Sequence, residues 1–250
     1  MNSKLDKIDR KLLAELDENS RQNISQIAKK IRVNQNTLQF RLKRLIEDKI
    51  ILGFYPSIDA SKLGFIAFRI YFNFINTTPE LEKQITDYLI KSKICTIVAE
   101  LEANYDVMFM AVVGANNEFY NFWQEFKEKY RKSIENEQIA FISKVNHFKR
   151  NYLTDSEKRG SELIGESEPI KLDKEDKEIL SMLSKNCRIP ALEISEKTNI
   201  PPRTVIYKIK QLEKKHVVLG YRVNINLSKI GYEYFKINLK LSDNSKLSEF

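Results

Sequence analysis

Residues 34–59 read NQNTLQFRLKRLIEDKIILGFYPSID, and residues 201–226 read PPRTVIYKIKQLEKKHVVLGYRVNIN. The second stretch follows at an offset of 167 positions (201 against 34), and the two align without insertion or deletion. Leu38, Leu42 and Leu45 recur at helical spacing, so they share one face of a helix. The matching face of the second stretch carries Val205, Ile209 and Leu212. We therefore expect the same half-buried helix twice, each time followed by the strand of a wing or hinge.

The similarity extends beyond these helices. It joins Leu5–Phe65, here called copy 1, to Leu172–Tyr232, here called copy 2. In copy 1, helical spacing of apolar residues predicts a first helix that Asp6 caps and a second helix that contains Ile27 and Ile31. A brief turn at Arg32 leads to the third helix. Two short helices joined by a tight turn, the second of them basic, are typical of a helix-turn-helix.

Positive charge is concentrated in the two copies. Residues 1–64 hold 13 Lys/Arg against 8 Asp/Glu, and residues 171–231 hold 13 against 7, which gives +5 and +6. Residues 65–153 hold 11 of each and are neutral. Basic segments beside a neutral one indicate a binder of polyanions such as nucleic acid. The alternative is that both copies simply carry solvated basic faces.

A different pattern occupies residues 65–152. Alternating apolar residues in 66–74 predict a strand with one buried face. Two helical stripes, at residues 79–92 and 119–130, and three further apolar runs complete the order βαββαβ. This order predicts a ferredoxin-like sandwich, and we expect the aromatic residues of the second stripe to lie in its core rather than around a cofactor.

The fold class predicted from these elements is α+β. The expected domains are a winged helix-turn-helix at 1–60, a ferredoxin-like sensing and dimerisation domain at 61–153, a flexible linker at 154–170, a second winged helix-turn-helix at 171–228, and the truncated start of a second sensing domain at 229–250. The linker assignment follows from its acidic, Ser- and Gly-rich composition. Alternating apolar residues in this last segment predict the first strand of that domain at Tyr232–Leu241. Because the remaining chain is too short for a second sandwich, we expect the sequence to be a fragment or the missing part to come from elsewhere.

Other classes of protein lack their signatures in this sequence. It has no apolar run of roughly 18 residues and no signal peptide, so we expect a cytoplasmic protein. Two histidines and two cysteines have no metal-ligand spacing, and motifs of nucleotide binding and nucleophilic catalysis are absent. We therefore expect no metal and no cofactor, and a function other than catalysis.

The exposed face of each third helix is the candidate DNA-reading surface. Asn and Gln can pair with adenine, and basic residues further along the helix can contact phosphates. In copy 1 the candidates are Asn34, Gln35, Asn36, Thr37, Gln39, Phe40, Arg41, Lys43 and Arg44. In copy 2 they are Arg203, Thr204, Tyr207, Lys208 and Lys210. Because Arg203 follows two prolines where copy 1 has amides, we expect the copies to prefer different bases. The alternative for Asn34–Asn36 is that these residues simply cap the helix.

The chain resembles the Lrp/AsnC family of bacterial and archaeal transcription regulators. The resemblance rests on LDKIDRKLL, NISQIAKKI, RLKRL followed by IILGFYPSID, and the KLGF that opens the sandwich. It implies double-stranded DNA as partner and dimerisation through the sandwich. Lys49 and His216 stand where the family has glycine. Two copies in one chain depart from the single units of most members, and we expect an intramolecular pseudo-dimer or a homo-oligomer.

The resemblance also implies an effector. Many family members bind amino acids near a Gly-x-aromatic-Asp turn, which corresponds here to Ala103, Asn104, Tyr105 and Asp106. Alanine in place of glycine disfavours a left-handed turn and close approach of a ligand. Asp106 has the alternative role of capping the turn. We keep an amino acid or another small molecule as a candidate effector.

Two other functions are compatible with the same fold. Siroheme decarboxylases resemble this fold and act on a tetrapyrrole, and His147 with neighbouring basic residues would have to serve such a reaction. A lone histidine at a strand end more commonly has a structural role, and such an enzyme has no use for basic helix-turn-helix units. The third possibility is an effector-binding or assembly module that does not contact DNA.

Overall fold

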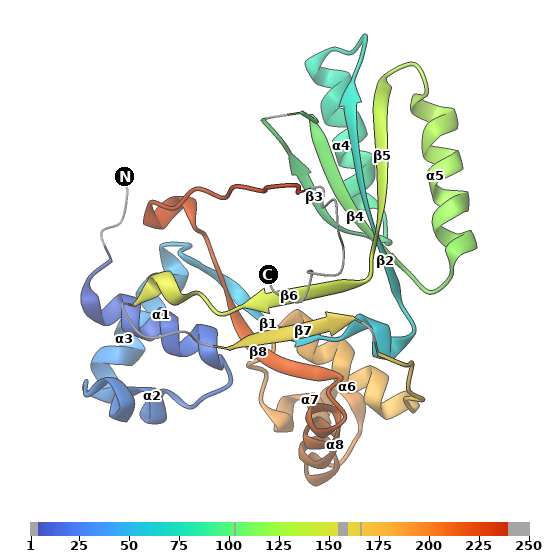
Figure 1. Cartoon of the computed structure of the whole chain (residues 1–250). Coiled ribbons are helices and arrows are strands. Elements are labelled where there is room, and N and C mark those ends of the chain that lie inside the picture. The colour runs from blue at the N-terminus through green and yellow to red at the C-terminus, as the bar shows by residue number, and fades with distance from the viewer. Residues whose placement is uncertain (1–4, 103, 155–159, 166, 240–250) are drawn as a thin grey trace.

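The computed structural model describes residues 5–102, 104–154, 160–165 and 167–239. Copy 1 forms α1 (Lys7–Glu18), α2 (Ile24–Ile31), α3 (Gln35–Glu47) and β1 (Ile51–Ile58). Copy 2 forms the equivalent α6 (Lys174–Lys185), α7 (Ala191–Thr198), α8 (Pro202–Lys214) and β8 (Val218–Ile225). In Figure 1 the two copies lie below the sandwich, copy 1 in blue and copy 2 in orange to red. Both predicted helix-turn-helix units are thus confirmed.

The first helix of each copy begins at the same capping motif. Asp6 accepts from the backbone of Asp9, and the Asp9 side chain accepts in return from the backbone of Asp6. Asp173 and Asp176 repeat this capping box at the start of α6. Such reciprocal caps satisfy backbone N–H groups that the first helical turn leaves without partners.

The sandwich has the predicted βαββαβ order. It comprises β2 (Ile66–Phe74), α4 (Pro79–Lys91), β3 (Cys95–Glu100), β4 (Val107–Val113), α5 (Asn116–Tyr130) and β5 (Ile134–Ile142). The four strands form an antiparallel sheet in the order β3-β4-β2-β5. One core joins sheet and helices, and it contains the predicted aromatic residues of α5, with Phe126 fully buried.

Strands β1 and β8 pair antiparallel and join the two copies into one body. Phe54 lies opposite Val223, and Pro56 lies opposite Tyr221. These two pairs are exchanged by the 167-residue offset, so the strands are related by a pseudo-two-fold axis. The expected intramolecular pseudo-dimer is therefore present at the level of the winged units.

Contacts beside the strands obey the same pseudo-symmetry. Ser20 Oγ and Cys187 Sγ, at equivalent positions, lie 3.1 Å apart. Arg21 donates to the carbonyl of Cys187, and its equivalent Arg188 donates to the carbonyl of Ser20. Each guanidinium also lies over an aromatic ring of the other copy, with Cζ 5.2 Å from the ring centroid. The interface is thus built like that of a homodimer, from two similar surfaces.

The expected flexible linker contains a strand. After β5 the chain forms β6 (Lys144–Phe148) and the 3₁₀ turn η2 (Asn151–Leu153), and β7 (Ser161–Gly165) then pairs antiparallel with β6. Glu162 of β7 is 9% exposed and accepts from Lys149 Nζ at 2.7 Å. It packs so closely on β8 that a Cβ at Gly220 would lie 2.5 Å from Glu162 Oε1. The composition of this segment predicted a solvated linker. Lys149 and Arg222, the basic residues that hold Glu162, lie outside the segment, so its composition gave no sign of them.

The end of the chain differs from the predicted strand at residues 232–241. Copy 2 continues into η3 (Ser228–Ile230), as copy 1 continues into η1 (Ala60–Leu63). The described residues 232–239 then contain no strand, and residues 240–241 lie outside the described part. Phe235, Ile237 and Leu239 are more than 70% exposed. Their alternation predicted a strand, but a strand also requires a partner for its backbone, and no described strand pairs with this segment.

The turn between each third helix and its strand is left-handed. Lys49 has φ +54° and its equivalent His216 has φ +55°. These are the two positions where the resembled family has glycine, and a side chain there carries conformational strain.

We expect Lys49→Gly to stabilise the protein by about 0.5–1 kcal/mol, because the relief of left-handed strain exceeds the entropic cost of glycine. The urea midpoint of unfolding should therefore rise. Asp48→Gly is the matched control, since Asp48 has φ −70° and gains nothing from glycine. Equal destabilisation by both substitutions would contradict the strain argument.

We also expect Ser20→Cys to form an intrachain disulfide with Cys187 under mild oxidation, because the two side chains meet across the axis. The oxidised chain should migrate faster than the reduced chain on a denaturing gel. The control S20C/C187S keeps Cys95 and the new thiol and should show no shift. An S20C chain that stays reduced, or forms only interchain products, would refute the β1–β8 arrangement.

Candidate nucleic-acid interface

Helix α3 buries one face and exposes the other. Leu38 and Leu45 are fully buried, and Leu42 packs against the same core. The predicted reading residues on the other face are exposed, namely Asn34, Gln35, Asn36, Thr37, Gln39, Phe40 and Lys43. Seven of the nine candidates of copy 1 thus lie together on the solvent-exposed surface of α3, from its N-cap to Lys43.

Asn34 is the N-cap of α3. Its side-chain oxygen accepts from the backbone N–H of Asn36 at 2.8 Å. The capping interpretation is thus confirmed for Asn34. The Asn36 side chain remains exposed beside Gln39 and Phe40.

The basic residues of α3 fall into two groups. Arg41 donates to Asp6 at 2.6 Å and to Asp9 at 3.0 Å, and Arg44 donates to Asp9 at 2.6 Å. The backbone N–H of Asp9, helped by Arg41, holds the pKa of Asp6 below its ordinary value. Lys43 is 76% exposed and forms a 3.7 Å ion pair with Glu47, one turn along the helix. Lys43 is therefore available for a phosphate, whereas Arg41 and Arg44 fasten α3 to α1.

Copy 2 repeats this division. Lys208, equivalent to Arg41, lies 2.5 Å from Asp173 and 3.1 Å from Asp176. Burial acts to lower the pKa of Lys208, but these hydrogen bonds outweigh it and raise the pKa above its ordinary value. Lys210, equivalent to Lys43, is exposed. Arg41 and Lys208 were predicted to contact DNA, and each is held by carboxylates that cap the first helix of its copy, so a phosphate contact by either side chain stays a prediction.

The exposed tip of α8 differs from that of α3. Arg203 and Tyr207 are exposed, whereas Thr204 is partly buried. Tyr207 and its equivalent Phe40 are 61% and 69% exposed, so each copy presents one aromatic ring. Ile206, which was not among the predicted residues, is 47% exposed at the position of Gln39. The repeat could have identified Ile206, because its equivalent in copy 1, Gln39, is one of the predicted residues.

The predicted effector turn is held by its own chain. Asp106 accepts from the backbone N–H of Phe74 at 2.8 Å, which supports its capping role. Tyr105 donates to Gln138 at 2.9 Å, and the carbonyl of Asn104 accepts from Asn73 at 3.2 Å. Ala103 lies outside the described residues. Ligand binding at this turn stays a prediction.

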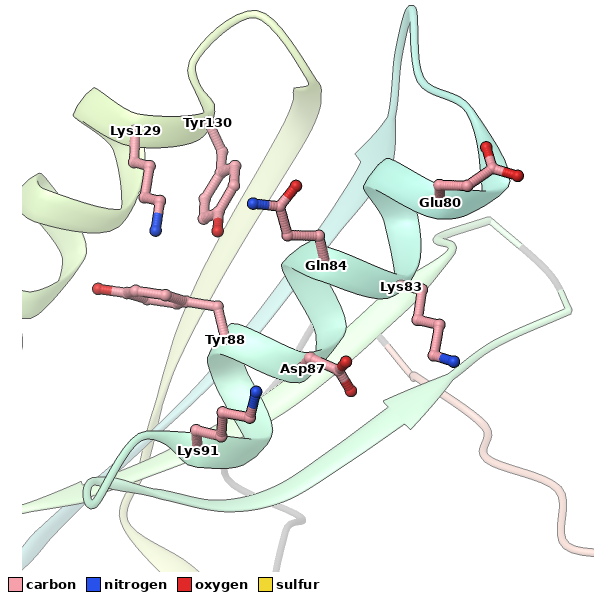
Figure 2. Close-up of a pocket in the computed structure, with 8 residues that line it drawn as sticks. All are labelled: Glu80, Lys83, Gln84, Asp87, Tyr88, Lys91, Lys129 and Tyr130. Atoms are coloured by element: carbon pink, nitrogen blue, oxygen red, sulfur yellow. The ribbon is translucent and has the colours of Figure 1, made fainter.

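A separate pocket lies on the helical side of the sandwich. Figure 2 shows its residues, which come from α4 and the end of α5: Glu80, Lys83, Gln84, Asp87, Tyr88, Lys91, Lys129 and Tyr130. The rings of Tyr88 and Tyr130 lie 5.6 Å apart, and Lys129 Nζ lies 4.7 Å from the Tyr88 ring. Burial, with help from Glu125, raises the pKa of Tyr88. The pocket carries both signs of charge and includes none of the predicted effector residues.

His147 lies in a cluster of charged groups. Its Nδ1 is 3.7 Å from Glu162, and burial together with Arg222 lowers its pKa. Among the described residues, no group of three or more His, Cys, Asp or Glu side chains could hold a metal ion. In the same part of the chain, every helix is too short or too polar to cross a membrane.

Comparison with known sequences supports both copies. A family model described as winged helix-turn-helix DNA-binding matches residues 5–51 and 172–218. The HTH-type transcriptional regulator LrpA of Pyrococcus horikoshii is 41% identical over 66 residues, which are 26% of this chain and 47% of that protein. The HTH-type transcriptional regulator Ptr1 of Methanocaldococcus jannaschii is 41% identical over 61 residues, 24% of this chain and 41% of that protein. The matched segment thus spans less than half of each relative.

Solved structures share the fold at low identity. The AsnC family transcriptional regulator from Agrobacterium tumefaciens has a TM-score of 0.50 at 19% identity and covers 55% of this chain and 90% of its own. The siroheme decarboxylase NirDL has a TM-score of 0.60 at 16% identity and covers 86% of this chain and 65% of its own. The chain thus contains two winged helix-turn-helix DNA-binding domains that flank a βαββαβ sandwich, and it is similar in sequence to archaeal HTH-type transcriptional regulators and in fold to a regulator of the AsnC family.

Proposed function

We propose that the chain is a sequence-specific DNA-binding transcription regulator whose two winged units act as one asymmetric reading head. The observation that carries this proposal is the paired arrangement of β1 and β8, which fixes two exposed and chemically different third helices in one body. In a helix-turn-helix dimer, two such helices enter successive major grooves about one helical turn apart.

The exposed surfaces supply the two kinds of contact that such binding needs. Lys43 and Lys210, at equivalent positions, offer exposed ammonium groups to phosphates on each side of the axis. Gln39 and Asn36 of α3 offer amides that match the major-groove edge of adenine. Arg203 of α8 offers a guanidinium that matches guanine or a phosphate. The two halves of the target site should therefore differ in base composition.

The ion pairs inside each copy serve this function indirectly. Arg41 and Lys208 fasten the third helix to the capping carboxylates of the first helix. A reading helix must keep its orientation to discriminate bases, and a second layer of fixed contacts provides that orientation. We assign Arg41 and Lys208 to this positioning role, and Lys43 and Lys210 to phosphate contact.

The runner-up is a tetrapyrrole enzyme, which the likeness to NirDL over 86% of this chain favours. At 16% identity this likeness concerns the fold. The residue that such chemistry would need, His147, is next to Glu162 in a cluster that joins β7 to β8. The basic charge and exposed amides of the third helices favour the regulator. A visible absorption band on addition of a tetrapyrrole, without any DNA binding, would reverse this ranking.

We expect Gln39→Ala to weaken binding to a preferred duplex by about 1–3 kcal/mol while leaving a scrambled duplex nearly unaffected. Lys43→Ala should weaken binding to both duplexes alike and reduce the slope of log affinity against log salt by about one. Both side chains are exposed, so the fold should be unchanged. The measurement is a titration of each duplex at several salt concentrations.

The matched control for these variants is Lys210→Ala, which should reproduce the effect of Lys43→Ala from copy 2. Asp48→Ala, an exposed change outside the candidate residues, should leave both affinities as in the parent chain. Salt-independent binding, or equal losses on both duplexes for Gln39→Ala and Lys43→Ala, would overturn the assignment.

A further inference from the structure

The pseudo-symmetry of the winged interface is broken by one buried ion pair. Arg222 of β8 donates through Nε and one terminal nitrogen to the two carboxylate oxygens of Asp17 of α1, at 3.1 and 3.2 Å. Both side chains are fully buried. At the equivalent positions the chain has Tyr55 in copy 1 and Ser184 in copy 2. Ser184 is exposed and donates to the carbonyl of Ser181 at 2.9 Å. One side of the interface therefore has a charge pair, and the other side has none.

The pairing of β1 with β8 places the asymmetric residue Arg222 at the pseudo-two-fold axis. Tyr55 of β1 lies directly opposite Arg222 of β8, and these two residues are equivalents of each other. If two copies 2 paired in the same way, Arg222 would face a second Arg222, and Ser184 would stand where Asp17 now accepts. If two copies 1 paired, Tyr55 would face Tyr55, and Asp17 would lack Arg222. Buried charges without partners strongly disfavour an arrangement.

Neighbouring charges do not remove this preference. Arg150 binds Asp17 through its backbone N–H at 2.7 Å and through its guanidinium, so Asp17 keeps one partner in any pairing. Within the described part of the chain, Arg222 has one other carboxylate, Glu162, whose Oε2 lies 3.6 Å away and whose Oε1 accepts from Lys149. His147 also lies beside Glu162. In a pairing of copy 2 with itself, two Arg222 side chains would face each other without Asp17, each left with the Phe148 carbonyl and with a Glu162 that already binds Lys149. That pairing is therefore the least compensated one.

We propose that the Asp17–Arg222 pair makes the winged interface selective for unlike copies. Copy 1 then pairs with copy 2, within one chain or between two chains of an oligomer, and copy 2 does not pair with copy 2. The kind of partner that β8 accepts is thus a winged unit with a carboxylate at the position of Asp17. This selectivity follows from the interface alone and does not depend on DNA binding.

The chain contains its own reporter for the wrong pairing. Because Ser20 and Cys187 are equivalent and meet across the axis, two paired copies 2 would bring Cys187 against the Cys187 of another chain. With Cys95 replaced by Ser, an interchain disulfide on a nonreducing gel therefore reports pairing of copy 2 with itself.

The test moves the carboxylate from one copy to the other in the full chain with Cys95→Ser. D17S/S184D removes the pair from the unlike interface and offers Arg222 a carboxylate in a second copy 2. D17S/S184N is the matched control, since it loses the same pair without adding a charge. We expect roughly tenfold more Cys187-linked dimer for D17S/S184D, the combined effect of the two charge pairs, one on each side of the axis, that two paired copies 2 would gain. Cys187-linked dimer should be minor in the parent chain and in the control.

Equal dimer fractions in D17S/S184D and D17S/S184N would overturn the proposal. So would a parent chain that forms Cys187-linked dimer as readily as D17S/S184D. If loss of Asp17 unfolds the double variants, as circular dichroism would reveal, the single variants S184D and S184N decide. Ser184 is exposed, so both should fold. More dimer in S184D than in S184N supports the selectivity, and equal amounts refute it.

Discussion

The antiparallel pairing of β1 with β8 determines where both third helices lie, because each strand follows directly from its helix through a left-handed turn at Lys49 or His216. Each backbone hydrogen bond between β1 and β8 joins parts of the chain about 170 residues apart. The whole sandwich domain, β2 to β5, lies between the two strands in the sequence. Around the ladder, Arg21 and Arg188 repeat the same contact on each side of the axis. A single chain thereby obtains the geometry that a symmetric dimer obtains by association, with the high effective concentration that a covalent connection provides.

Because the chain contains two copies of the winged unit, equivalent positions can carry different residues. The charged residues differ in this way both on the exposed third helices and at the interface between the copies. On the outer surface, the ion pairs of Arg41 and Lys208 preserve the frame of each copy, while the exposed residues at the helix tips differ. At the interface, the frame is again kept, but Asp17 and Arg222 place one charge on each side of an otherwise pseudo-symmetric contact. Glu162 and Arg150 reach this pair from the segment that leaves the sandwich, so the sandwich domain is connected to the paired strands through the same charges.

Periodicity and repetition were sufficient to predict the helix-turn-helix units, the βαββαβ order and the pseudo-dimer, since each depends on local pattern or on a comparison within the chain. What could not be predicted depends on partners distant in sequence. The ion pairs of Arg41 were not foreseen, because the carboxylates that hold it, Asp6 and Asp9, belong to another helix. Residues 161–165 were assigned to a linker because β6 and Arg222 lie elsewhere in the chain. Residues 232–239 have the alternation of a strand, but alternation does not supply a neighbouring strand.

The central claim is that one chain presents two different reading helices as a single unit. Selection of bound duplexes from a random pool by the full-length chain tests it most directly, because the recovered motif records the number, spacing and identity of the half-sites. The account predicts an asymmetric motif of two unlike half-sites with centres about one helical turn, roughly 10 base pairs, apart. A palindromic motif, or a motif only one half-site wide, would contradict it.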